Sequence, residues 1–230
     1  MVDRSKAKIQ CWVLLAVLCL AAGCSQTRLD LHETATLNSL RQVNDWPLYV
    51  MHYRGAYAPA SEGRAADAGQ APAADRSESG PAWACSLFAA LGDPANRLYG
   101  RNFDWQHSPA VLLFTDPPGG YASVSMVDVA YLGYTGDGAQ GLDERPLTDL
   151  RPLLNAPYLP FDGMNERGLA IGMAAVSPGG MAVDPDKETR DSLAVMREIL
   201  DRAADVDEGL AILDRYNIDF GGGPPPKSML

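Results

Sequence analysis

Short runs of alternating apolar and polar residues fill the middle of the chain, and this pattern predicts a series of β-strands. The first is Pro47–Tyr53, which is rich in aromatic and β-branched residues. Turn signals such as Gly92-Asp93-Pro94 separate the later strands. These later strands are predicted at Ser86–Leu91, Arg97–Trp105, Ala110–Thr115, Tyr121–Leu132 and Gly168–Val176.

Apolar residues at helical spacing predict two helices after the strands. Ser192–Ala203 places its apolar residues on one face, and Asp191 or Ser192 can cap its start. Val206–Tyr216 repeats the pattern, and the Gly-Pro run 221–226 stops it. A short helix is predicted within Ala35–Val43, and Gly133–Pro160 is predicted to be mostly loop with a helical turn at Thr148–Leu154. Strands followed by helices indicate an α+β fold with helices packed on an antiparallel sheet.

The segment Ala56–Pro81 differs from its surroundings, because it is built from Ala, Gly, Pro, Ser, Asp and Arg with almost no bulky apolar residue. Such a segment buries too little surface to offset the entropy of ordering it. We therefore predict a flexible, exposed loop that leads directly to Cys85.

The first 23 residues have the pattern of an export signal. Three basic residues precede the apolar run Cys11–Ala22, which is too short to span a bilayer comfortably. The run ends in Leu20-Ala-Ala-Gly-Cys24, which resembles the lipobox of bacterial lipoproteins, with Ala21 where that motif usually has Leu. The resemblance implies lipidation at Cys24 and a bacterial, extracytoplasmic, membrane-anchored protein. An ordinary secretory signal cut near Ala22 and an uncleaved helical anchor are the alternatives.

The charge of the chain restricts its partners. The formal net charge is −10, and the first 23 residues carry +2, so the remainder carries −12. Nucleic acid is excluded as a partner, because its binding requires a basic surface. No His, Cys or carboxylate cluster has the spacing of metal ligands, so neither a metal nor another cofactor is expected. The sequence does not indicate the oligomeric state.

Cys85 is the only cysteine after the predicted signal and lipidation site. It therefore cannot form an internal disulfide. A lone cysteine is commonly a small buried hydrophobe, but one at a chain start could act as a nucleophile, with its own α-amine as the base. His107 is the only histidine after Cys85, so a Cys–His dyad is a further alternative.

Two further motifs contain residues suited to support a thiol nucleophile. Gly100-Arg-Asn-Phe-Asp104 supplies Arg101, which would favour a thiolate, and Asp104, which would hold the α-ammonium. Gly163-Met-Asn-Glu-Arg-Gly-Leu169 supplies Asn165, whose amide N–H could stabilise an oxyanion. The simpler alternatives are a structural salt bridge on a strand and ordinary turn chemistry at Asn165.

These motifs occur in the order and at the spacing of a known family. Arg101 and Asp104 follow Cys85 by 16 and 19 residues, and Asn165 lies in the later motif. The chain thus resembles the choloylglycine hydrolase and penicillin acyltransferase group of N-terminal nucleophile hydrolases. The resemblance implies catalytic roles for Cys85, Arg101 and Asp104, an oxyanion-hole role for Asn165, and a four-layer αββα sandwich.

The resemblance also implies a domain organisation and an activity. The chain would cut itself before Cys85 and then hydrolyse a linear amide bond in a small N-acyl substrate, or transfer the acyl group to an amine. Residues 1–23 would be the signal, 24–84 the anchor, propeptide and loop, and 85–230 the first part of the hydrolase domain. Members of this family usually continue beyond the point where this chain ends. The alternative is therefore a truncated, catalytically inactive lipoprotein with a binding role or none.

Overall fold

The computed structural model describes residues 28–46, 48–57, 84–104, 109–175, 183–220 and 227–229. Residues 31–230 form one compact unit by themselves. The predicted signal, Cys24, nearly all of the predicted loop 56–81 and His107 lie outside the described residues.

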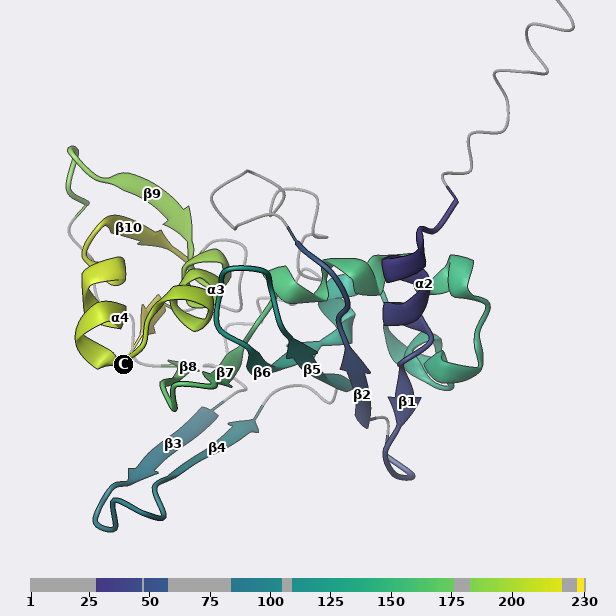
Figure 1. The fold of residues 1–230 in the computed structure, drawn as a ribbon, viewed down its shortest axis with the longest axis horizontal. Helices are drawn as coiled ribbons and strands as arrows, with labels where there is room; N and C mark the ends of the chain where they lie inside the picture. Colours follow the sequence, from purple (N-terminus) through teal and green to yellow (C-terminus); the bar gives the residue numbers. More distant parts are fainter. Residues whose placement is uncertain are drawn as a thin grey trace, which may run out of the picture. The chain divides into compact units, whose positions relative to one another are not determined.

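A seven-stranded mixed sheet is the centre of this unit (Figure 1). Its strands follow the order β1-β2-β5-β6-β7-β8-β11, in which β2 and β5 pair in parallel and every other pair is antiparallel. The strands are β1 (Arg41–Gln42), β2 (Leu48–His52), β5 (Ala110–Thr115), β6 (Ser123–Asp128), β7 (Asp162–Asn165), β8 (Ala170–Ala175) and β11 (Lys227–Met229).

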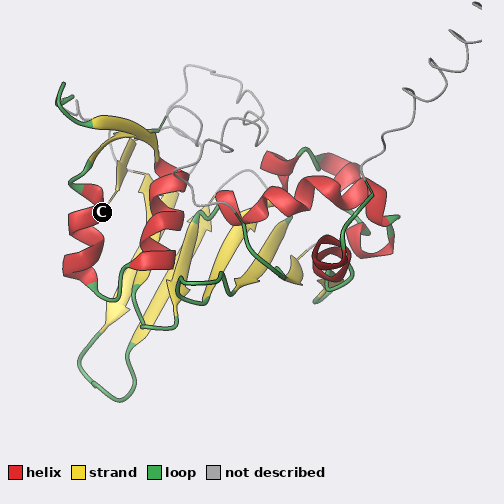
Figure 2. Cartoon of the chain, turned by 45° about the horizontal axis from the view of Figure 1, so that its top comes forward, coloured by secondary structure: helices red, strands yellow, loops and turns green. Residues whose placement is uncertain are grey.

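Helical segments cover one face of this sheet (Figure 2). The strand residues that point toward them are fully buried, as Tyr49, Met51, Val111 and Leu113 show. On β7, Gly163 lies against α3, because a Cβ placed there would come within 2.7 Å of Leu200 Cδ1. The helical segments are α2 (Leu31–Leu37), η3 (Val129–Leu132), η4 (Gly136–Ala139), η5 (Leu142–Glu144), η6 (Leu147–Tyr158), α3 (Ser192–Arg202) and α4 (Val206–Leu213).

The opposite face of the sheet carries a separate antiparallel hairpin at its β7–β8 end. The hairpin consists of β3 (Ala84–Ala90) and β4 (Leu98–Asp104). It packs closely on β8, where a Cβ at Gly172 would lie 2.3 Å from the Tyr99 hydroxyl. Beyond the hairpin, residues on this face of β5 and β6 are less buried, and Phe114 is 37% exposed. The described residues thus form three layers in the order helices, sheet and hairpin.

Much of the predicted secondary structure is confirmed. The strand at Ala110–Thr115 is found residue for residue as β5, and β2, β3, β4 and β8 lie within their predicted segments or one to two residues beyond them. The helix predicted from Ser192 is α3, and the Asp191 carboxylate accepts hydrogen bonds from the backbone N–H groups of Leu193 and Ala194. The predicted α+β class is confirmed, since helices pack on a mostly antiparallel sheet.

Tertiary contacts changed other predicted boundaries. The first helix ends at Leu37, before most of the predicted range, because Ser39 Oγ accepts from His52 N and directs the following residues to β2. The predicted strand to Leu132 stops at Asp128, whose carboxylate accepts from Ala130 N and starts η3. The predicted loop before Pro160 contains η6, in which Pro152 and Pro157 remove backbone donors.

The last predicted helix was too long. The helix α4 ends at Leu213, and Tyr216 instead begins β10 (Tyr216–Asp219). This strand pairs in parallel with β9 (Glu188–Asp191), which the residue pattern did not predict. A strand of four residues paired with a distant one carries too little periodicity to be read from the sequence.

Candidate functional site

The β3–β4 hairpin places Cys85 and Arg101 on the same face. Leu87 pairs with Arg101 across the hairpin, and Cys85, two residues before Leu87, points to the same side. This face is partly buried against the large sheet. The opposite face of the hairpin is exposed, and Phe88 and Leu98 are each 62% accessible.

Arg101 reaches from the hairpin into the sheet, where three oxygen atoms hold its guanidinium. Nη1 donates to Asp162 Oδ2 at 2.7 Å and to Phe161 O at 3.0 Å, while Nη2 donates to Met173 O at 2.6 Å. The same Nη2 lies 3.8 Å from Cys85 Sγ. The Arg101 side chain is only 6% exposed.

This contact places a buried guanidinium beside the Cys85 thiol. Cys85 is free and partly accessible. A guanidinium stays charged under all ordinary conditions and stabilises a thiolate beside it. Because its position is fixed by backbone carbonyls as well as by a carboxylate, Arg101 presents its charge in a defined geometry.

Asp162 belongs to this cluster, although no motif in the sequence indicated it. It lies on β7 directly before the Gly163–Leu169 motif, and its Oδ1 accepts from Met126 N at 3.2 Å. Its place before that motif was the available signal, but an isolated Asp on a short strand has no specific pattern. Only the packing of the hairpin on β7 and β8 identifies Asp162 as the partner of Arg101.

Tyr99 lies on the same hairpin face as Arg101 and contacts β8. Its hydroxyl is buried and has no hydrogen-bond partner among the described residues. Burial raises the pKa of Tyr99, and the neighbouring Asp162 carboxylate raises it further, while Arg101 lowers it. The Tyr99 phenol is therefore neutral and packs as a spacer between the hairpin and Gly172.

Asp104 and Asn165, the other two predicted site residues, are placed differently. Asp104 ends β4 opposite Ala84, next to Cys85 in β3, and its side chain lies outside what the structure describes. Asn165 ends β7 and is buried, and its Nδ2 donates to Leu200 O at 3.1 Å and to Ala203 O at 2.7 Å.

The Asn165 amide is thus used on the helix side of the sheet. Its Oδ1 also accepts from Arg167 N and Leu169 N, so it organises the turn after β7. An oxyanion role for Asn165 would require one of its two donated hydrogen bonds to be given up. The structure brings together Cys85 and Arg101, and it joins Asn165 to the end of α3.

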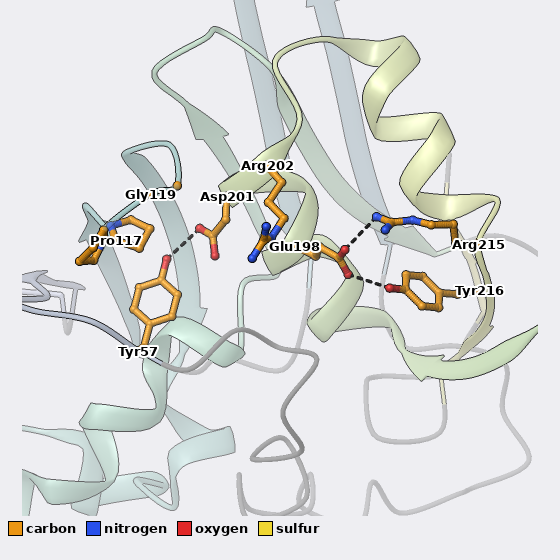
Figure 3. A pocket seen from close by; sticks show the side chains of 10 residues that line it. Tyr57, Pro117, Gly119, Glu198, Asp201, Arg202, Arg215 and Tyr216 are labelled. Atoms are coloured by element: carbon orange, nitrogen blue, oxygen red, sulfur yellow. Dashed lines mark hydrogen bonds and ion pairs between the residues drawn. The ribbon is translucent and has the colours of Figure 1, made fainter.

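A cavity of about 320 Å³ lies elsewhere, beside the second half of α3 (Figure 3). None of the predicted site residues lines it. Its carboxylates are already paired, since Asp201 binds Arg197 and Tyr57 while Glu198 binds Arg215 and Tyr216. The lining consists of Tyr57, Pro117, Pro118, Gly119, Gly120, Glu198, Asp201, Arg202, Arg215 and Tyr216.

Clustered metal ligands and membrane-spanning helices are both absent from the described residues. No group of three or more His, Cys, Asp or Glu side chains in the described ranges is arranged to hold a metal ion. Within the same ranges, no helix combines the length and apolar character needed to cross a membrane.

Comparison of the chain with protein-family models, with curated proteins and with solved structures finds no match. The chain's own residues and their geometry are therefore the basis for assigning a function.

Proposed function

We propose that this protein hydrolyses a linear amide bond in a small N-acyl substrate, with Cys85 as the nucleophile. The observation that carries the proposal is the 3.8 Å contact between Cys85 Sγ and Arg101 Nη2, in which the guanidinium is fixed by three oxygen atoms. The motif order that predicted this pair from the sequence supports the same conclusion.

The proposed reaction has two steps. The Cys85 thiolate attacks the amide carbonyl carbon, the C–N bond breaks, and the amine leaves with a proton, so that an acyl thioester remains on Cys85. Water then attacks the thioester, which releases a carboxylic acid and restores the thiol. An amine in place of water would give acyl transfer by the same route.

A free α-amine on Cys85 would supply the base for both steps, and it requires scission of the Ala84–Cys85 bond. In the proposed maturation, Sγ attacks the Ala84 carbonyl, the acyl group moves from nitrogen to sulfur, and water hydrolyses the thioester. The products are a carboxylate on Ala84 and an amine on Cys85. Asp104 is proposed to hold this ammonium, because β4 places it opposite Ala84.

The arrangement of layers fits the proposed αββα architecture. Helices, a large sheet and a hairpin carrying the nucleophile are stacked in that order, as the contacts of Gly163 with Leu200 and of Gly172 with Tyr99 indicate. In this proposal the β3–β4 hairpin is the beginning of the second sheet. Asn165 is retained as an oxyanion donor only if the end of β7 rearranges, because its side chain lies on the α3 side of the sheet and Cys85 lies on the other.

We also propose that Cys24 carries a lipid and holds the protein at a bacterial membrane outside the cytoplasm. The lipobox-like sequence Leu20–Cys24 supports this proposal. Labelling of cells with a radioactive fatty acid should mark the wild-type protein but not a Cys24→Ser variant. Equal labelling of both would contradict the proposal.

Maturation and activity test the proposed nucleophile directly. Intact mass after incubation at pH 7 should show a chain split between Ala84 and Cys85, whereas Cys85→Ala should stay whole. The matched control is Ser86→Ala, a neighbouring exposed residue of β3, which should split as wild type does. Wild type and Ser86→Ala should also release amine from members of a panel of N-acyl amino acids and conjugated bile acids, whereas Cys85→Ala should not. A wild-type chain that stays whole and releases no amine would overturn the proposal.

A further inference from the structure

Asp162 and Cys85 contact different nitrogens of the Arg101 guanidinium. Its Oδ2 lies 2.7 Å from Arg101 Nη1, while Cys85 Sγ lies 3.8 Å from Nη2. The Asp162 side chain is 18% exposed and that of Arg101 is 6% exposed, so water screens this ion pair less than it screens surface pairs. The Cys85 thiol therefore lies beside an arginine whose positive charge is partly offset by the Asp162 carboxylate.

The position of Arg101 does not depend on Asp162 alone. Phe161 O and Met173 O each accept a hydrogen bond from the guanidinium, at 3.0 Å and 2.6 Å. These carbonyls belong to the backbone of the sheet and would remain after a substitution at Asp162. The charge of Asp162 and its structural contacts can therefore be separated by experiment.

We propose that Asp162 moderates the reactivity of Cys85 by offsetting the charge of Arg101. This inference rests on the proposed function only in taking Cys85 as the reactive group. Asp162 acts through Arg101 and does not itself touch the substrate. A negative charge near a thiol opposes its ionisation, so removing that charge while Arg101 stays in place increases the thiolate fraction.

The described ionisable groups around Cys85 are few, which simplifies the test. Arg101 and Tyr99 face it from β4, Asp162 lies on β7, and β8 carries no ionisable residue. Asp104 also ends β4, opposite Ala84, and its side chain lies outside the described residues. A unit charge several ångströms away in a partly buried site changes a thiolate population by roughly three- to tenfold. Asp162→Asn should therefore raise the alkylation rate of Cys85 at pH 7 by about threefold.

The experiment measures iodoacetamide modification of Cys85 in the full-length protein, with peptide mass mapping to separate it from the other cysteines. Arg101→Gln should react about tenfold more slowly than wild type, opposite in direction to Asp162→Asn. Ser86→Ala should react as wild type does. At about pH 10.5, well above the ordinary thiol pKa of about 8.5, the rates of folded variants should converge, which controls for accessibility.

The results distinguish an electrostatic role of Asp162 from a purely structural one. Faster alkylation in Asp162→Asn, with convergence at high pH, supports the proposal. An unchanged or slower rate in Asp162→Asn, with a lowered melting temperature, would show that Asp162 only attaches the hairpin to the sheet and would overturn it. If Asp162→Asn does not fold, Asp162→Glu, which keeps the charge, should restore folding with the wild-type rate; a faster rate in that variant would also overturn the proposal. If the wild-type protein hydrolyses no amide, the proposed function is contradicted, but the alkylation rates of Cys85 still test the role of Asp162.

Discussion

Two arginines lie almost completely buried on opposite faces of the same sheet, and each pairs with an aspartate. Arg197 of α3 has no exposed side-chain surface and binds Asp201 at 2.6 Å and Ser123 Oγ at 2.7 Å. Arg101 of the hairpin binds Asp162 at 2.7 Å on the other face. The difference is the remaining neighbour, because Arg101 contacts a free thiol whereas Arg197 packs near the Tyr57 ring at 5.7 Å.

The surroundings of the two pairs differ in what the neighbouring polar groups contact. On the helix side, the sheet residues around Arg197 are closed off by α3, and buried polar groups such as Asn165 are used to connect the layers. On the hairpin side, Cys85 and Asp162 retain some accessible surface. A buried ion pair therefore connects layers on one face and lies beside a partly accessible thiol on the other.

The largest expected effect is on the helix side. Arg197→Ala removes the partner of Asp201 and leaves a buried carboxylate uncompensated, which should reduce the free energy of unfolding by about 3–5 kcal/mol. Urea denaturation measures this loss. The alkylation rate of Cys85 in the remaining folded protein should not change; a large change there would show that the two faces are coupled.

Asn165→Ala should have the next largest effect. It removes donors from two carbonyls at the end of α3 and acceptors from two turn N–H groups, so a loss of about 2–3 kcal/mol in unfolding free energy is expected. Asn165→Asp, which keeps the acceptors, should still be destabilised because its carboxylate would face carbonyl oxygens. Unchanged stability with reduced amide hydrolysis would instead favour an oxyanion role.

Two glycines allow a matched comparison of the faces. A Cβ at Gly163 would meet Val124 O and Leu200 Cδ1, each at 2.7 Å, whereas one at Gly172 would meet the side chains of Tyr99 and Leu87. Both Ala variants should lose about 1–3 kcal/mol, with Gly163→Ala at the upper end because a backbone atom must move. Only Gly172→Ala should change Cys85 alkylation; the reverse pattern would contradict the assigned faces.

The smallest effect concerns pH. Burial raises the pKa of Asp201 although Arg197 and Tyr57 bind it and lower the pKa in part. A raised pKa in the folded state means that the folded protein binds the proton more tightly. The stability that this tighter proton binding contributes is present below about pH 4, and it is lost as the pH rises through the folded-state pKa of Asp201. Asp201→Asn should flatten the melting-temperature curve above pH 4, and an unchanged curve would contradict this assignment.

Local sequence was sufficient where an element carries its own signal. The strand β5 and the capped helix α3 were predicted because a short apolar run bounded by turn residues, apolar periodicity and an Asp before a helix act over a few residues. The same reasoning failed for β9 and β10 and for the end of α2, whose structures depend on partners about 30 and 13 residues away. Contacts of that kind leave no periodic trace in either segment.

The sequence by itself determined which residues could serve as a nucleophile and its arginine partner, since Cys85 is the only cysteine after Cys24 and Arg101 lies in a distinctive motif. The pairing register of β3 and β4, which the sequence did not predict, places the two on one side of a hairpin. Only the tertiary structure decided that Asp162 completes this cluster and that Asn165 is engaged by α3. The physical reason is that a side chain on β7 points to one face or the other according to register. Which layer covers each face depends on the packing of segments distant in the chain.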